Sequence, residues 1–275
     1  MKIVLLTSDY HLSANIAVKT FLAHPRLKKH DIQIAGIIAC PPYQTNDSTF
    51  QSMQSFIKQA GWAFSLKSIL TTIWKTFAIK FGKWFVPNKN REYFDIDELA
   101  TEHNIPLLEA HNINSKKAKA FMRKFQPDYL VSCFLIQIVD KEVLEIPQKG
   151  AINIHPALIQ KHRGRLTAFW TLLKNWKRAG ATVHFMTEKV DQGMIILQKH
   201  FFVYPSDTIY SVNKKSAELG AKLLIKALIK LKRKEIKGYF IKRLGQMFKT
   251  PTVEDIKEFY RRGKSIMTVR NFFEI

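Results

Sequence analysis

The chain has 275 residues, 46% of them hydrophobic, which suffices for one large globular domain or a domain with a small appendage. It carries 44 Lys and Arg against 22 Asp and Glu, a formal net charge of +22. This balance favours anionic partners such as nucleic acid, phosphorylated small molecules or an acidic membrane surface, with a basic surface kept for solubility as the alternative.

Nothing in the sequence indicates export or a membrane span. The apolar run after Met1 ends at Thr7 and is too short for the core of a secretion signal. No apolar stretch approaches the ~20 residues that cross a bilayer. The two cysteines, Cys40 and Cys133, form neither a disulfide framework nor a zinc set. We therefore expect a cytoplasmic protein, with peripheral membrane contact left open.

Strand patterns and helix patterns alternate from the first residues to about residue 230. Apolar, β-rich runs predict strands at 3–7, 32–39, 105–110, 128–135, 150–156, 181–186 and 194–203. Helical spacing predicts helices at 14–24, 95–104, 115–125, 167–180 and 206–231, with a single turn at 141–147. This order predicts an α/β fold, a Rossmann-like open, mostly parallel sheet with helices on both faces, plus a short helical C-terminal tail. We divide the chain into an α/β domain at 1–235 and a small helical tail at 236–275.

Several predicted helices have end signals. Asp95 and Ser115 are N-cap candidates, and Ser13 has the same role before the first helix. Thr167 and Gly180 suit the start and the end of the helix predicted at 167–180.

A helical insertion at about 45–93 interrupts the α/β order. Residues 56–85 are aromatic and basic and contain no acid, and their apolar residues recur at three and four positions. Three interpretations stay open: a lid or acceptor pocket, an amphipathic helix on anionic lipid, or helices packed on the sheet with their lysines turned outward.

Two polar side chains interrupt the apolar strand at 150–156. Asn153 and His155 are two apart and so point to the same side of the strand, and Pro156 ends it. His155 should therefore lie at the carboxyl end of a parallel strand, where open α/β sheets bind ligands. An amide donor beside an imidazole suits the stabilisation of an oxyanion and proton transfer near neutral pH. A plain turn cap is the alternative.

An acid in a later turn completes the candidate group. Asp191 lies in the tight "DQG" turn between two predicted strands. A carboxylate placed there would orient His155 and favour its protonated form.

Three stretches, "NIHPALIQKHRGR", "TVHFM" and "VDQGMIILQ", resemble the folate-dependent formyltransferase family. That family includes methionyl-tRNA, glycinamide ribonucleotide and amino-sugar N-formyltransferases. The resemblance covers roughly residues 128–231. It implies that Asn153, His155 and Asp191 are catalytic, that 10-formyltetrahydrofolate donates the formyl group to an amine, and that no metal takes part. Asn153 and His155 would stabilise the oxyanion, while Asp191 would keep His155 charged and help to relay the proton of the amine.

The resemblance also implies where the ligands bind. The folate would lie against a set of strand-end and loop residues: Phe134, Leu135, Ile136, Val139, Val190 and Gly193. The acceptor would meet a second set: Ser8, Ser13, Asn15, Arg163 and His184. Plain core packing for the first set, and a buried structural role for His184, are the alternatives.

The identity of the acceptor amine rests on weaker signals. The glycine-rich phosphate loop of the glycinamide ribonucleotide enzymes is missing from "TSDYHLSAN". The residues after Leu231 look helical and differ from the C-terminal barrel of the tRNA enzymes. We therefore expect an anionic small-molecule amine, an amino sugar or sugar nucleotide, with tRNA as the second candidate. From another class, a basic RNA- or membrane-binding module on an inactive formyltransferase fold also stays open, as does a homodimer.

Overall fold

A seven-stranded sheet forms the centre of the protein. The structure is a computed structural model, which describes residues 1–9, 11–42, 49–62, 64–66, 68–70, 73, 77, 95–236, 238–241, 244–268 and 271. The strand order is β3-β2-β1-β4-β5-β7-β8. The strands are β1 Lys2–Ser8, β2 Gln33–Cys40, β3 Leu107–Glu109, β4 Tyr129–Cys133, β5 Ala151–His155, β7 Arg178–Phe185 and β8 Ile195–Phe202. Pairs from β3 to β5 are parallel, whereas β7 and β8 are antiparallel to their neighbours. The predicted mostly parallel α/β fold is confirmed.

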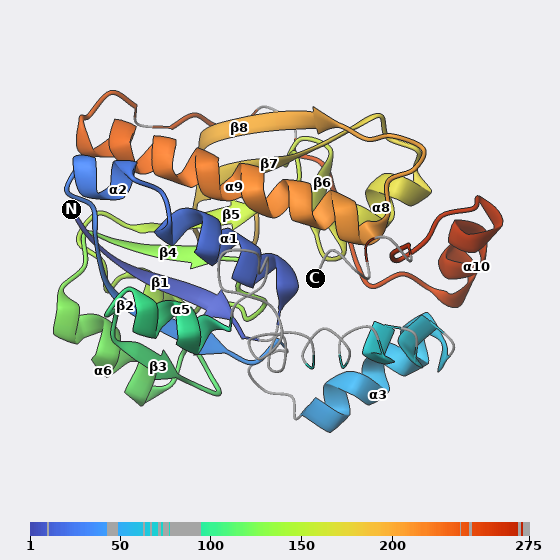
Figure 1. Cartoon of the computed structure of the whole chain (residues 1–275), viewed down its shortest axis with the longest axis horizontal. Helices are drawn as coiled ribbons and strands as arrows, with labels where there is room; N and C mark the ends of the chain where they lie inside the picture. The colour runs from blue at the N-terminus through green and yellow to red at the C-terminus, as the bar shows by residue number, and fades with distance from the viewer. Residues whose placement is uncertain are drawn as a thin grey trace.

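Helices cover both faces of this sheet (Figure 1). Apolar residues of α1, α5 and α9 pack on one face, and those of α6 and α7 pack on the other. The strands are nearly continuous in hydrophobic residues because both of their faces are buried. The helices of the described residues are α1 Leu12–Leu22, α2 Arg26–Lys29, α3 Thr49–Ala60, α5 Ile96–Glu102, α6 Lys116–Phe125, α7 Lys141–Leu144, α8 Thr167–Leu173, α9 Ile209–Lys232 and α10 Val253–Arg261. None of them is long and apolar enough to pass through a bilayer.

The strand β5 presents two chemically different sides. Ile152 and Ile154 belong to the core beneath α1 and α9. Ala151 belongs to the opposite core, which α6 and α7 cover. Because side chains alternate along a strand, Asn153 and His155 share the side of Ala151. There they meet His184 of β7, the segment that begins at His162, and Asp191.

A second, two-stranded sheet adjoins this position. β6 (His162–Gly164) pairs in parallel with β9 (Gln246–Phe248), so the C-terminal part of the chain holds the segment that follows β5. The helix α10 then packs on α8, with the rings of Phe169 and Phe259 stacked at 4.8 Å between centroids. The C-terminal helix was predicted, and the strand β9 was not.

The insertion packs on helices at one end of the molecule (Figure 1). Ala60 and Phe64 join a core cluster that contains residues of α8 and α10. The ring of Phe64 meets Phe169 edge-on at 6.1 Å and Tyr260 at 6.4 Å. The described ring contacts of the insertion therefore run to α8 and α10. The residues from 78 to 94 lie outside the described part of the chain.

Several predicted helix ends were correct and others were wrong. Asp95 and Ser115 cap α5 and α6 through their side chains, as expected. The helix expected at 167–180 ends at Leu173, and Gly180 lies inside β7, because pairing with β8 takes up that segment. The residue before α8 is Leu166, so Thr167 is not its N-cap. Ser13 lies within α1 and is no cap.

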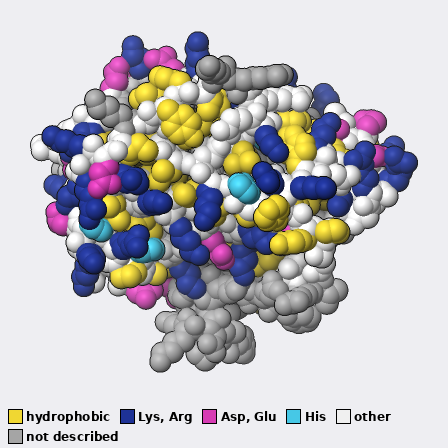
Figure 2. All heavy atoms as spheres, turned by 90° about the horizontal axis from the view of Figure 1, so that it is seen from above, with side chains coloured by type: hydrophobic (Ala, Val, Ile, Leu, Met, Phe, Trp, Pro, Cys, Tyr) yellow, Lys and Arg dark blue, Asp and Glu magenta, His cyan; other side chains and the backbone are white. Residues whose placement is uncertain are grey.

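Basic side chains dominate the visible surface. Figure 2 shows Lys and Arg scattered over the face that it presents, with few Asp and Glu among them. This distribution agrees with the formal charge of +22 and means that an anion meets a positive field from this side.

Candidate active site

The site begins with two side chains of β5 and one loop carboxylate. Nδ1 of His155 lies 3.4 Å from Oδ1 of Asp191. The imidazole of His155 is 4% exposed and Asp191 is 8% exposed, while Asn153 is half-buried. The structure thus brings together the three residues predicted as catalytic, and Asn153 is the member nearest to solvent.

The loop that carries Asp191 has to fold back over the sheet. β7 runs antiparallel to β5, so Phe185 at the end of β7 pairs with Ile152 near the start of β5. The β7–β8 connection therefore leaves at the end opposite His155, and only a tight return brings Asp191 to it. At Gly193 in this return, an added Cβ would lie 1.8 Å from the carbonyl oxygen of Phe185. Only glycine fits there.

Asp191 is an ionised carboxylate in a polar enclosure. Its Oδ2 accepts a hydrogen bond from the backbone N–H of Gly164 at 3.0 Å. Burial opposes ionisation, yet His155, the Gly164 N–H, His184 and Arg163 together hold the pKa of Asp191 below its ordinary value. Because the carboxylate stays charged at neutral pH, it anchors the groups around it.

His184 connects Asp191 with Asn153. Burial, more than any neighbour, lowers the pKa of His184 to about 4, so the ring is neutral at pH 7. Its Nδ1 faces the carbonyl oxygen of Phe185 at 2.8 Å and must donate there. Nε2 is then a lone-pair acceptor for the amide nitrogen of Asn153, at 3.2 Å. This bond fixes the Asn153 amide and leaves its second N–H for a ligand.

His155 is held on both sides. Its Nε2 lies 3.1 Å from the carbonyl oxygen of His162, and Nδ1 faces Asp191. Both partners are acceptors, so each can receive a hydrogen bond from an N–H group of the ring. A substrate oxygen that reaches His155 has to replace the carbonyl of His162.

The segment around β6 holds two residues to which the sequence assigned no role. His162 supplies the carbonyl for His155, and Gly164 supplies an N–H for Asp191. Gly164 has a φ of +89°, and a Cβ there would lie 2.3 Å from the Phe248 carbonyl, so β9 also requires glycine. The Arg-Gly step in the sequence was the available signal, but only Arg163 received a role from it.

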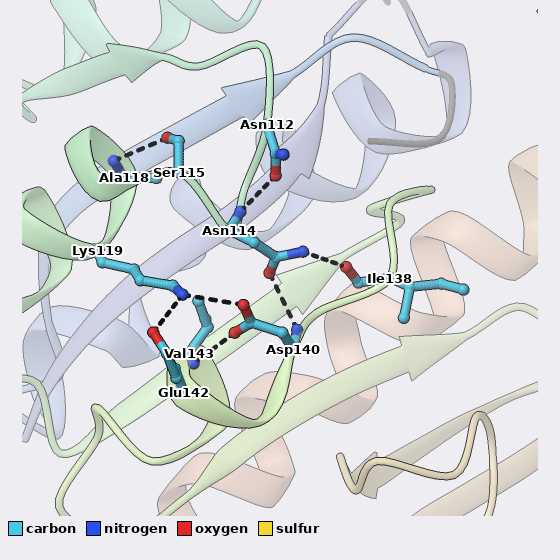
Figure 3. Close-up of polar contacts among 9 residues, drawn as sticks. All are labelled: Asn112, Asn114, Ser115, Ala118, Lys119, Ile138, Asp140, Glu142 and Val143. Carbon is cyan, nitrogen blue, oxygen red and sulfur yellow. Dashed lines mark hydrogen bonds and ion pairs between the residues drawn. The ribbon is translucent and has the colours of Figure 1, made fainter. Parts of the chain in front are cut away.

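The loop predicted to meet the folate is tied down from three directions. The backbone N–H of Ile136 donates to Oγ of Ser8 at 2.9 Å. Gln137 accepts from Ile113 N–H and donates to the carbonyl of His111. Asn114 donates to the carbonyl of Ile138 and accepts from the N–H of Asp140, both at 3.0 Å (Figure 3). These hydrogen bonds therefore fix the backbone of the loop at 136–140 before any ligand binds.

Asp140 anchors the far end of this loop (Figure 3). Its Oδ1 accepts from the N–H of Val143 and caps α7, while Lys119 donates to its Oδ2 at 2.9 Å. Lys119 also reaches Glu142 at 2.6 Å, which joins α6 to α7.

The remaining predicted ligand residues are divided between surface and core. Val190 is 44% exposed, whereas Phe134, Val139 and Gly193 are buried and Leu135 and Ile136 are half-buried. Ser8, Ser13 and Asn15 are all buried, so they do not present an anion site at the surface in this structure.

Two of the residues predicted to contact the acceptor substrate lie beside Asn153, His155 and Asp191. Arg163 donates from Nε to the carbonyl of Gly245 at 2.9 Å and acts electrostatically on Asp191. His184 is 2% exposed and lies against Asn153, which favours a positioning role over substrate contact. The roles of both residues stay predictions.

Comparisons with known proteins fit this geometry. The sequence profile of formyl transferases matches residues 83–228, more than half of the chain. A methionyl-tRNA formyltransferase of Thermotoga maritima is 34% identical over 137 residues, which cover 50% of this chain and 44% of that relative. A sugar N-formyltransferase from a Shewanella species superposes with a TM-score of 0.58 at 17% identity, covering 95% of this chain and 88% of the other. An N-formyltransferase from Helicobacter canadensis, in complex with folinic acid and dTDP-3-aminofucose, gives a TM-score of 0.55 at 13% identity, with 90% and 71% covered.

The fold is that of an α/β protein with a polar site on one side of its central sheet, around Asp191. The chain belongs to the formyl transferase family. It spans less than half the length of the first curated relatives that it matches. The solved structures share its fold, and their sequence identities of 17% and 13% are too low to assign more than the fold.

Proposed function

We propose that the protein is a 10-formyltetrahydrofolate-dependent N-formyltransferase whose acceptor is the primary amine of an amino sugar or a sugar nucleotide. The observation that carries the proposal is the 3.4 Å approach of His155 to Asp191 beside the amide of Asn153. This arrangement puts an anchored imidazole and an oriented amide donor at one place on the sheet. Such donors stabilise the negative charge that forms when an amine attacks a formyl carbon.

The proposed reaction needs no redox partner. The amine nitrogen bonds to the formyl carbon, and the carbonyl electron pair moves to oxygen, which the second N–H of Asn153 and the His155 ring stabilise. The oxyanion then restores its double bond and expels N10 of the folate. One proton leaves the amine and one is gained by N10, so the products are a formamide and tetrahydrofolate. Because the pKa of Asp191 is lowered, we assign it the anchoring of His155 rather than storage of that proton.

The loop at 134–140 is proposed to hold the pterin through its backbone. Ser8, Gln137 and Asn114 fix that backbone in advance, which reduces the entropy lost on binding. Phe134, Leu135, Ile136 and Val139 would then line the pterin site, with Val190 and Gly193 on the facing loop.

The choice of acceptor rests on charge and on the names of similar proteins. A net charge of +22 suits a phosphorylated small molecule. Similar solved structures include a sugar N-formyltransferase and an N-formyltransferase in complex with dTDP-3-aminofucose. Methionyl-tRNA is the second candidate, because the sequence relatives carry that name. Both acceptors are anionic amines.

The test is turnover with purified protein. Release of tetrahydrofolate from 10-formyltetrahydrofolate is followed with a panel of nucleotide-linked amino sugars and with methionyl-tRNA, and Asn153→Ala serves as the inactive control. We expect release with a sugar nucleotide that the control does not support. Release with methionyl-tRNA alone would move the assignment to the second candidate. No release with any amine, together with tight RNA or vesicle binding, would favour a binding module.

A further inference from the structure

Large apolar side chains of the insertion face solvent instead of the core. Trp62 is 72% exposed, Leu66 is 46%, Leu70 is 56% and Ile73 is 59%. Phe77 is half exposed as well. Single exposed apolar residues are ordinary, but a group of this size in one segment marks a contact surface.

These residues have the spacing of one face of a helix. All five have helical backbone, and their spacings are four, four, three and four residues. At about 100° per residue, all five fall within a sector of about 80°. Phe64 points to the opposite side and is 6% exposed in the core shared with α8 and α10. Among the described residues of this segment, Phe64 is therefore held in the core while five apolar side chains are exposed; we call Trp62, Leu66, Leu70, Ile73 and Phe77 the outer stripe.

The sequence segment that carries the outer stripe has charges of a single sign. Residues 56–85 of the sequence contain five lysines and no Asp or Glu. Lys58 is exposed in the described part of this segment. The neighbouring α10 carries three acids, of which Glu258 pairs with Arg261 and Arg262 and Asp255 accepts hydrogen bonds from Thr252, so that the exposed Glu254 is left against the lysines. An apolar stripe among lysines is complementary to a surface that combines acyl chains with anionic headgroups.

We propose that the outer stripe docks the protein on an anionic lipid bilayer, with the helix lying in the plane of the headgroups. Trp62 is suited to this level because its ring is amphipathic. Association with a second copy of the chain would place like charges opposite each other, which disfavours it. The proposal goes beyond formyl transfer and does not depend on it.

A single labelled cysteine tests the docking site directly. Cys40 and Cys133 are fully buried, and burial raises the pKa of each thiol to about 12, so both are poor targets for alkylation. Leu70→Cys therefore carries an environment-sensitive dye selectively, and Phe240→Cys, at a site that is 71% exposed, is the matched control. The probes are vesicles of phosphatidylcholine alone and of phosphatidylcholine with phosphatidylglycerol.

We expect the dye at position 70 to brighten roughly threefold or more with the anionic vesicles, and much less with neutral ones or at position 240. High salt should reverse the binding in part, because exposed charges are screened. Leu70→Ser with Ile73→Ser should abolish co-sedimentation with vesicles, whereas Tyr239→Ser with Phe240→Ser should not.

Two results would overturn the proposal. One is equal dye response at both positions, or none, with anionic vesicles. The other is brightening at position 70 without lipid, together with a mass in light scattering of twice 32.0 kDa, since this would assign the stripe to a second copy of the chain. Turnover of the soluble substrate by the Leu70→Ser, Ile73→Ser variant should equal that of the parent protein. The two assays therefore separate loss of docking from failure of the proposed function.

Discussion

The amide nitrogen of Asn153 lies 3.2 Å from Nε2 of His184, directly across the antiparallel pair of β5 and β7. A buried neutral histidine therefore sets the direction of the amide that would meet the substrate. Two strands keep this pair in register, so the orientation does not depend on a loop.

Replacing His184 should impair catalysis more than binding. His184→Ala removes the acceptor that orients Asn153, and we expect kcat to fall by about 10²-fold with the KM for the folate nearly unchanged. His184→Gln can accept from Asn153 through its side-chain oxygen and should recover part of the loss. Steady-state kinetics measure both. A similar loss in both variants would indicate a structural role alone.

The return of the β7–β8 loop can be tested at Gly193. Gly193→Ala would place its methyl group 1.8 Å from the Phe185 carbonyl oxygen, so the loop must shift and move Asp191 away from His155. We expect a loss of activity of about 10²-fold and a destabilisation of about 1–3 kcal/mol. Activity and thermal unfolding check this. Gly263→Ala is the control: nothing lies within 4 Å of its added Cβ, so it should retain full activity, while its φ of +66° makes alanine cost about 1 kcal/mol of stability there too.

Folate binding should depend on Asn114. Asn114→Ala removes both hydrogen bonds that fix Ile138 and Asp140, so the loop has to be ordered at the moment of binding. We expect the Kd for 5-formyltetrahydrofolate to rise by about 10-fold, from the loss of about 1.4 kcal/mol. Isothermal titration calorimetry measures the change. Lys141→Ala, on the exposed surface of α7, should bind the folate as the parent protein does. If Asn114→Ala also binds with the Kd of the parent protein, the loop at 134–140 is not part of the folate site.

Acid should destabilise the fold through two buried histidines. Burial, followed by the charge of His155, lowers the pKa of His162 to about 3, and burial lowers that of His184 to about 4. Below about pH 6.5 the unfolded chain gains protons that the folded protein excludes, so stability falls as the pH falls toward these values. Between pH 8 and pH 5, each of the two histidines should lower the free energy of unfolding by about 2 kcal/mol.

His162→Phe should remove one half of this acid sensitivity. The ring of His162 packs against Phe248 at 4.6 Å, and among the described residues its buried nitrogens meet only a weak contact with the backbone of Arg165. A phenyl ring keeps the packing and has no proton to gain. Urea unfolding at pH 8 and pH 5 measures the difference. An unchanged loss of stability at pH 5 would contradict the account.

The α/β order and the capping residues Asp95 and Ser115 could be predicted because they depend on local periodicity and side-chain chemistry. The end of α8 could not. Gly180 looks like a helix stop, yet it lies in β7, where pairing with β8 leaves room only for glycine because an added Cβ would meet the Lys199 carbonyl at 2.3 Å. The strand pairing that selects glycine there is a tertiary contact and leaves no local signal.

The candidate site was predictable where a motif carried it. Asn153, His155 and Asp191 were identified from spacing and resemblance, and the structure brings them together. The backbone groups of His162 and Gly164 were missed, because a carbonyl or an N–H has no residue identity. Their positions depend on β9, which lies more than eighty residues later in the chain.

The most direct test of the central claim is single-turnover release of tetrahydrofolate by Asp191→Asn. Asparagine keeps the size of the side chain and an acceptor for Gly164, and it removes the charge that anchors His155. We predict a rate at least about 10²-fold below that of the parent protein, with folate affinity retained. A rate within about twofold of the parent protein would contradict the account, because the carboxylate would then have no part in the reaction.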